Sequence, residues 1–314
     1  MRVFLAGATG ALGRRLLPKL LEAGFDVTGT TSSSSKLAAL EAAGVHGVVM
    51  DGLDVTSVDD AVAGARPDVV VHQLTALAHM SGNPRNFEKD FAETNRLRTR
   101  GTDLLLAAAR AAGTERFIAQ SYAGWPSERT GSWVKGENDP LDPAPTAVSA
   151  RTVEAIRHLE AVVTGATDLD GLALRYGSLY GPGTGLGTGG NLLAMVAKRR
   201  FPVAGGGTGM FSFCHIDDAA TATVAAVTHG APGVYIVADD EPAPVSEWLP
   251  YLAASIGAKP PMRLPAWLAA PLLGEHGMSM MTQIRGSSNA KAKAELGWRP
   301  SYPSWREGFR SGLS

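Results

Sequence analysis

The chain has 314 residues, 45% of them hydrophobic, and a formal net charge of −1. This length suits one large α/β domain or two interlocked ones, and the balanced charge excludes a strongly basic nucleic-acid-binding protein or a membrane-surface protein. Cys214 is the only cysteine, so an internal disulfide is excluded. Because the start fits no signal peptide and the apolar runs are too short to span a bilayer, we expect a cytoplasmic protein.

The chain opens with a short apolar run that breaks into glycines at Gly7, Gly10 and Gly13, after which leucines recur at helical spacing. A strand, a tight turn and a helix in this order predict the first half of a nucleotide-binding βαβ unit, although a glycine turn without a ligand is the alternative. Gly7 permits the turn, Gly10 lets the main chain approach a pyrophosphate, and Gly13 allows close helix packing. The helix N-terminus would hold the phosphate. The predicted contacts are Gly7, Thr9, Gly10, Ala11, Leu12 and Gly13.

The second predicted strand, residues 25–30, ends in a serine-rich segment without a carboxylate. An NAD site usually holds an acidic residue here against the ribose 2′-hydroxyl. Thr31 and Ser32, with Arg14 nearby, instead suit a 2′-phosphate. We therefore predict a preference for NADP(H), with NAD(H) as the alternative, while a serine-rich turn that binds nothing is the simpler interpretation.

Strands and helices alternate through most of the remaining chain. We predict strands at 45–50, 66–72, 116–121 and 233–237, and helices at 37–43, 58–63, 87–112, 147–163 and 191–200. This order predicts an α/β fold, a doubly wound parallel sheet of the NAD(P)-binding Rossmann type with a smaller, mostly C-terminal substrate lobe. We place the sheet domain at residues 1–175 and the lobe at 176–314, with about 212–238 returning to the sheet.

Several motifs together resemble the extended short-chain dehydrogenase/reductases, the NAD-dependent epimerase/dehydratase family. They are GxxGxxG with Ala8 and Thr9 inside it, PDVVVH at 67–72, GTDLL at 101–105, LRYGSLYGPG at 174–183 and FCHIDDA at 213–219. The resemblance covers nearly the whole chain and implies a nicotinamide cofactor bound at the ends of the strands. The further contacts that we expect for it are Asp51, Gly52, Gln73, Leu74, Thr75, Gln120, Tyr176 and Leu179.

The sequence departs from this family at the residues that carry catalysis. In active relatives a Tyr and a Lys four residues later lie on one helix; the Lys holds the nicotinamide ribose, and the Tyr exchanges a proton with the substrate. No tyrosine of this chain has a lysine four residues on. Aligned on Glu160, the Tyr position is Thr152 and the Lys position is Ile156. The same spacing puts the family's helical Asn at Arg98 and its active-site Ser or Thr at Tyr122, so the Tyr–Lys mechanism is absent.

The resemblance implies an NAD(P)-dependent oxidoreductase, and these changes imply that its active site is non-standard. Tyr122 is the first candidate for the proton donor, because it replaces a residue that points at the substrate in the family. Ser121, Thr152, Tyr176 and Tyr180 are weaker candidates. A cofactor-binding sensor without chemistry is one alternative, and an isomerase or lyase with a bound cofactor, including a nucleotide-sugar epimerase, is another.

The substrate is expected to be neutral, or an aromatic carbonyl compound. Phe211 stands where the family has the Arg that clamps the diphosphate of a nucleotide sugar, and a phenyl ring cannot replace that fork. The methionines at 278–281 suit an apolar ligand but equally suit core packing. The predicted substrate contacts are Tyr122, Trp125, Ser178, Phe211 and Met281.

The sequence also bears on metal ions, macromolecular partners and self-association. His215 with Asp217 and Asp218 has metal-ligand chemistry, but the three open a helix within a structural motif of the family, so we expect no metal. We expect no nucleic acid or membrane partner. Extended members often pair through the helices at 87–112 and 147–163, so the resemblance implies a homodimer.

Overall fold

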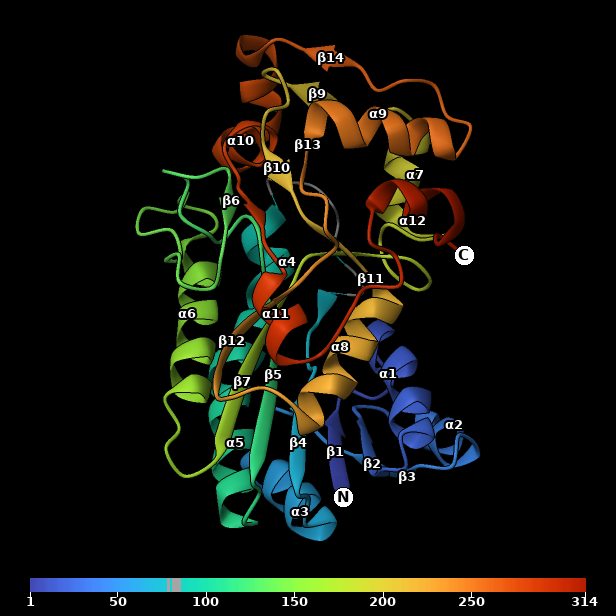
Figure 1. Ribbon diagram of the computed structural model, residues 1–314, viewed down its shortest axis with the longest axis vertical. Helices are drawn as coiled ribbons and strands as arrows, with labels where there is room; N and C mark the ends of the chain where they lie inside the picture. The colour runs from blue at the N-terminus through green and yellow to red at the C-terminus, as the bar shows by residue number, and fades with distance from the viewer. Residues whose placement is uncertain (78–79, 81–85) are drawn as a thin grey trace.

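A seven-stranded parallel sheet forms the centre of the computed structural model, which describes residues 1–77, 80 and 86–314 (Figure 1). Its strand order is β12-β7-β5-β4-β1-β2-β3. The strands are β1 (Arg2–Ala6), β2 (Asp26–Thr31), β3 (His46–Val49), β4 (Val69–His72), β5 (Arg116–Tyr122), β7 (Asp170–Tyr176) and β12 (Gly233–Val237). The predicted doubly wound α/β fold is therefore confirmed.

Helices cover both faces of the sheet, which explains why β4 is buried throughout and reads as a run of valines. One face packs on α1 (Ala11–Glu22), α2 (Leu37–Ala42), α8 (Ile216–Thr228) and α11 (Ala290–Glu295). The other face packs on α3 (Val55–Ala65), α5 (Thr102–Ala111) and α6 (Ala150–Thr164). Figure 1 shows α6 on one flank, α1 on the other and the remaining lobe beyond the carboxyl ends of the strands.

The prediction of one continuous helix over residues 87–112 is wrong at residues 97–101. The structure has α4 (Phe87–Arg96), a π-helical turn η4 (Leu97–Gly101) and then α5. Within this region the Thr99 hydroxyl donates to the Asn95 carbonyl over 2.9 Å, so a side chain competes with the helix ladder where its period changes. Single π-helical turns often occur at functional sites.

The other predicted helices differ from the structure at their ends, and two of them show why. Helix α3 begins at Val55, three residues before the predicted start, because the Asp54 carboxylate accepts the Ser57 N–H over 2.8 Å and caps it. Helix α7 (Asn191–Ala197) ends before the three basic residues expected in its last turn. The backbone of Arg199 has a left-handed conformation, with φ 56°, and its Nε donates a hydrogen bond to the Pro260 carbonyl over 2.9 Å.

The lobe has its own core around Trp248, Trp305 and Phe213. Its helices are α7, α9 (Val245–Ser255), α10 (Ala266–Thr282) and α12 (Trp305–Ser311), and its short strands are β6 (Val134–Lys135), β8 (Ser178–Tyr180), β9 (Val203–Ala204), β10 (Met210–Phe211), β11 (Phe213–His215), β13 (Ala243–Pro244), β14 (Arg263–Leu264) and β15 (Gly286–Ser287). Strand β11 pairs with β8, whereas β12 pairs with β7 in the main sheet. Over the described ranges, no helix combines the length and hydropathy needed to cross a membrane.

Candidate active site

The candidate site lies along one edge of the sheet. All seven strands are parallel, so the exits of β1, β4, β5 and β7 lie at the same edge, next to the lobe (Figure 1). Ligands of open α/β sheets bind outside the carboxyl ends of the strands. The predicted cofactor residues and the substrate residues Tyr122, Trp125 and Ser178 lie at or near the ends of sheet strands, whereas the predicted substrate residues Phe211 and Met281 lie in β10 and α10.

The glycine turn after β1 forms a cradle for phosphate. Gly7 has φ +93°, and a Cβ on Gly13 would lie 2.2 Å from the Gly7 carbonyl oxygen, so α1 can pack here only with glycine. Gly10 precedes α1 without any side-chain cap. The N–H groups in the first helical turn of α1 therefore have no side-chain acceptor and face the glycine turn. This arrangement fits the pyrophosphate of a dinucleotide.

The end of β2 supplies hydroxyls and no carboxylate. The Thr9 hydroxyl lies 3.3 Å from the Thr31 hydroxyl, and the Ser33 N–H donates to the latter, also at 3.3 Å. Arg14 is exposed in the first turn of α1, and its Nη2 approaches Gly183. This donor set has the chemistry that a 2′-phosphate needs.

The exit of β3 packs on the exit of β4. Asp51 accepts the Leu53 N–H over 2.9 Å and so closes its own turn. A Cβ on Gly52 would lie 2.5 Å from a methyl group of Leu74, so the absence of a side chain lets the two loops meet. The expected cofactor residues Asp51, Gly52 and Leu74 thus lie together.

The exit of β4 joins the core beneath α8. The Gln73 side-chain amide donates to the Tyr176 hydroxyl over 3.1 Å, and this hydroxyl lies 2.7 Å from that of Thr223. Burial raises the pKa of Tyr176. Gln73 Oε1 is buried without a hydrogen-bond partner among the described residues, so it can accept from a bound group. The remaining expected cofactor residues Thr75, Gln120 and Leu179 are half-buried.

Tyr176 and Ser121, both weaker candidates for the proton donor, have structural partners. The Tyr176 ring belongs to the hydrophobic cluster beneath α1 and α8, not to the cluster that contains Trp125. The Ser121 hydroxyl donates to Glu160 over 2.6 Å, and the same carboxylate accepts two hydrogen bonds from Arg175. Packing and hydrogen bonding account for both side chains.

Thr152 and Ile156 lie one turn apart on α6, and both are buried. The Asn95 side-chain amide donates to the Thr152 hydroxyl over 3.0 Å. The positions where the resemblance places the Tyr and the Lys therefore carry a bonded hydroxyl and an apolar chain. Neither supplies an acid with a pKa suited to proton transfer near neutral pH.

Tyr122 and Ser178, two predicted substrate contacts, meet in the structure. Their hydroxyl oxygens lie 2.9 Å apart. Burial raises the pKa of Tyr122, while the hydrogen bond to Ser178 and the charge of Arg98 oppose this shift. The phenol is therefore protonated at neutral pH.

An aromatic wall stands next to Tyr122; it consists of Phe87, Phe91, Trp125 and His276. The Trp125 ring centroid lies 5.8 Å from that of Tyr122, 5.3 Å from Phe87 and 5.5 Å from His276. Burial lowers the pKa of His276 to about 4, so its ring is neutral. Flat apolar faces of this kind suit an aromatic ligand.

Phe211 and Met281 lie in the same hydrophobic cluster as Trp125, and both side chains are buried. The Phe211 ring stacks on Phe213 at 5.9 Å and lies 5.1 Å from Trp248. Packing on Phe213 and Trp248 in the lobe therefore explains Phe211.

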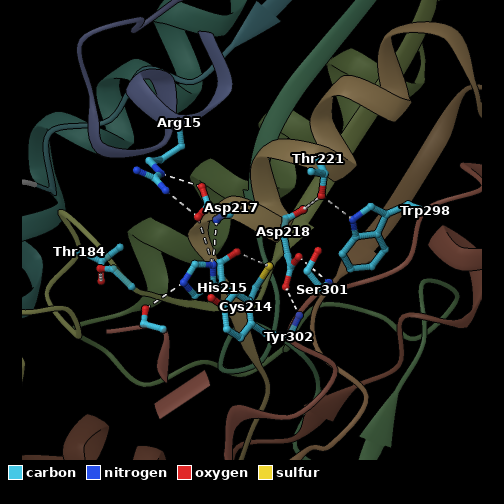
Figure 2. A network of polar contacts seen from close by, with 12 residues as sticks. Arg15, Thr184, Cys214, His215, Asp217, Asp218, Thr221, Trp298, Ser301 and Tyr302 are labelled. Atoms are coloured by element: carbon cyan, nitrogen blue, oxygen red, sulfur yellow. Dashed lines mark hydrogen bonds and ion pairs between the residues drawn. The ribbon is translucent and has the colours of Figure 1, made fainter. Parts of the chain in front are cut away.

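The motif around His215 ties three parts of the chain together (Figure 2). Asp217 accepts two hydrogen bonds from Arg15 at 2.6 and 2.7 Å, and Asp218 accepts the N–H groups of Ser301 and Tyr302. His215 Nε2 donates to the Gly312 carbonyl over 2.9 Å. These side chains bond to protein atoms, and the residues that the structure describes contain no cluster able to hold a metal ion.

Sequence reasoning missed four residues here: Phe87, Phe91, His276 and Arg98. Phe87 and His276 come from segments that no sequence spacing connects with Trp125. Arg98, used only as an alignment position, lies on the buried stripe of its helix with Phe91 and Thr94. That stripe follows the helical period, so the period alone could have placed Arg98 inside.

The chain matches proteins of known class. Residues 3–238 match the NAD dependent epimerase/dehydratase family. A Streptomyces "3-diazoavenalumate denitrifying reductase" is 47% identical over 98% of this chain and 99% of its own length. A "2-alkyl-3-oxoalkanoate reductase" of Stenotrophomonas maltophilia is 27% identical over 82% of this chain and 76% of its own.

Solved structures share the fold. A UDP-glucose 4-epimerase of Thermotoga maritima, crystallised with UDP-glucose, superposes with a TM-score of 0.77 at 21% identity over 100% of this chain and 97% of its own. A human epimerase family protein with NADPH gives a TM-score of 0.74 at 19% identity over 100% and 99% of the two chains. At these identities the likeness shows the fold alone.

Proposed function

Because the chain belongs to the NAD-dependent epimerase/dehydratase family and is an NAD(P)-dependent oxidoreductase, we propose that it replaces an aromatic diazo group by hydrogen. The proposal is supported by the glycine turn, whose geometry suits a phosphate, together with Thr152 and Ile156, which lie where the family resemblance places the proton-transfer pair. The name of the Streptomyces relative, a denitrifying reductase of a diazo compound, supports the same reaction.

The chemistry explains why the usual pair is dispensable. Bound NAD(P)H supplies a hydride. An arenediazonium carbon that gained this hydride would form a C–H bond and lose its bond to nitrogen, and dinitrogen would leave with the electron pair of that C–N bond. The balance is diazonium ion plus NAD(P)H giving arene, N₂ and NAD(P)⁺. No proton enters or leaves, so no Tyr–Lys acid is needed.

The residues of this chain would bind, orient and shield the reactants. The cradle from Gly7 to Gly13 would hold the pyrophosphate. The aromatic wall would hold the arene flat against the strand exits and exclude water, which otherwise converts a diazonium ion to a phenol. Arg14, Thr31 and Ser32 would take the 2′-phosphate of NADP(H), the cofactor that we propose as preferred.

The proposal is tested with 4-carboxybenzenediazonium labelled with ¹⁵N on both nitrogens. Purified protein with NADPH should release labelled N₂ and form benzoate, in amounts equal to the NADPH consumed. A reaction without protein measures the background. If the protein accelerates neither process, or if 4-hydroxybenzoate is the product, the proposal is wrong.

Ketone reduction is the second candidate. It needs a proton for the alkoxide, and Tyr122, protonated and half-buried beside Ser178, would be its donor. The 27% identical oxoalkanoate reductase supports this candidate. A sensor without chemistry has less support, because both of these relatives carry the names of reductases.

We also infer a homodimer through α4, α5 and α6. In support, His158 of α6 lies 2.7 Å from Asp103 of α5, so these helices form one continuous surface. Light scattering should give twice the chain mass. A monomer at every concentration would contradict this.

A further inference from the structure

Arg98 is a buried arginine that hydrogen-bonds to none of the described residues through Nε or Nη1. It lies in the π-helical turn η4, is 3% exposed and sits against α6. Both nitrogens are enclosed by protein. Buried guanidinium groups usually have carboxylate or carbonyl partners, because an unpaired charge in the interior is costly.

The charges around Arg98 do not balance. Glu160 is the carboxylate whose field acts on it, but that carboxylate is already occupied. Its oxygens accept hydrogen bonds from Arg175 at 2.7 and 2.6 Å and from Ser121 at 2.6 Å. Arg175 therefore pairs with Glu160, and Arg98 has no ion-pair partner among the residues that the structure describes.

Arg98 keeps this charge at neutral pH. Burial lowers its pKa to about 10, while the fields of Tyr122 and Glu160 act in the opposite direction. A group with this pKa is almost fully protonated at pH 7. The fold therefore holds a cation that stays charged at neutral pH and whose field acts on Tyr122. The Tyr122 ring lies next to Trp125 of the aromatic wall.

We propose that Arg98 binds an anionic oxygen of the aromatic substrate, a carboxylate or an aryl oxide. The location of the substrate rests on the proposed function, whereas the demand for an anion rests on the unpaired guanidinium. A planar fork binds such an oxygen strongly where water is excluded. Arg98 would then fix the ring against the aromatic wall and favour anionic arenes over neutral ones.

The test uses probes without a diazo group, so its outcome does not depend on the proposed reaction. Calorimetry on protein loaded with NADP⁺ compares cinnamate with cinnamamide, and 4-nitrophenolate with 4-nitroanisole in alkaline buffer. We expect one anion to bind about tenfold or more tightly than its neutral match, as a charge-assisted contact predicts. The pair that shows the difference identifies the oxygen as carboxylate or aryl oxide.

Arg98→Met should abolish that preference and raise the thermal midpoint, because it removes an unpaired buried charge. The matched control Arg175→Met should lower the midpoint, because it strands the Glu160 carboxylate. A purely structural Arg98 would behave like Arg175. If Arg98→Met does not fold, Arg98→Lys serves in its place. It keeps the positive charge and loses the planar guanidinium, so it should bind the anionic probe more weakly than the wild-type protein does. Equal binding of anions and neutral probes by the wild-type protein, or an unchanged preference in the folded variant, would overturn the proposal.

Discussion

The side-chain amide of Asn95 donates a hydrogen bond to the Thr152 hydroxyl over 3.0 Å and so joins α4 to α6. Thr152 stands where the family resemblance places the reactive tyrosine, and its hydroxyl is used in this helix contact. Ile156, one turn later, is buried. At the two positions where the resemblance places the Tyr and the Lys, the chain therefore has a hydrogen-bonded hydroxyl and a buried apolar side chain.

Tyr122→Phe separates the two candidate reactions. Removing the hydroxyl takes away the proton donor for a ketone, so ketone reduction should fall by about 10²- to 10⁴-fold. Turnover of a diazonium probe should change by less than about threefold, since it requires no proton. Steady-state kinetics with both probes measures this. A large loss with the diazonium probe would assign Tyr122 a role in that reaction too.

Gly13→Ala tests the phosphate cradle. The new Cβ would meet the Gly7 carbonyl at 2.2 Å, so α1 must shift. We expect the free energy of unfolding to fall by about 1–3 kcal/mol and NADPH affinity to fall with it. The matched control is Gly64→Ala in α3, where a Cβ meets nothing within 4 Å. It should stabilise the helix by about 0.5–1 kcal/mol and leave NADPH binding unchanged; equal effects of both variants would count against the cradle.

Arg14→Gln tests the cofactor preference. If the guanidinium pairs with a 2′-phosphate, the contact contributes about 1–3 kcal/mol, or roughly 5- to 150-fold in affinity. The variant should lose that factor for NADPH and keep its affinity for NADH. Titration calorimetry gives both constants. Wild-type protein that binds NADH as tightly as NADPH would refute the preference.

The Arg15–Asp217 pair predicts one feature of the acid stability (Figure 2). Burial disfavours the charged form of Asp217, but the hydrogen bond and charge of Arg15 outweigh it, so the pKa of Asp217 is lowered. A lowered folded-state pKa gives stability that is present above the ordinary Asp value near 4 and lost as the pH falls through the folded value.

Asp217→Asn should therefore lower the thermal midpoint near neutral pH and match the wild-type protein once the pH falls below the lowered pKa of Asp217. Both side chains are partly exposed, so solvent screening limits the loss to about 1 kcal/mol. Thermal unfolding at several pH values measures this. A difference that persists in acid would mean that the aspartate acts through packing instead of charge.

Local patterns made the sheet predictable, whereas the site depends on contacts between distant segments. The spacing of the glycines from Gly7 to Gly13 predicts the turn before α1, and the run of valines predicts the buried strand β4. The aromatic wall joins α4, the loop after β5 and α10, and no periodicity links these elements. The π-helical turn also escaped prediction, because it depends on how Thr99 and its neighbours bond within the folded helix.

Transfer of deuterium tests the central claim most directly. NADPH labelled with deuterium on the reactive face of C4 is mixed with the protein and 4-carboxybenzenediazonium, and the benzoate is analysed by mass spectrometry. We predict one deuterium on the ring carbon that carried nitrogen, with no label acquired from deuterated water when unlabelled NADPH is used. Benzoate that takes its new hydrogen from solvent would contradict direct hydride transfer at this site.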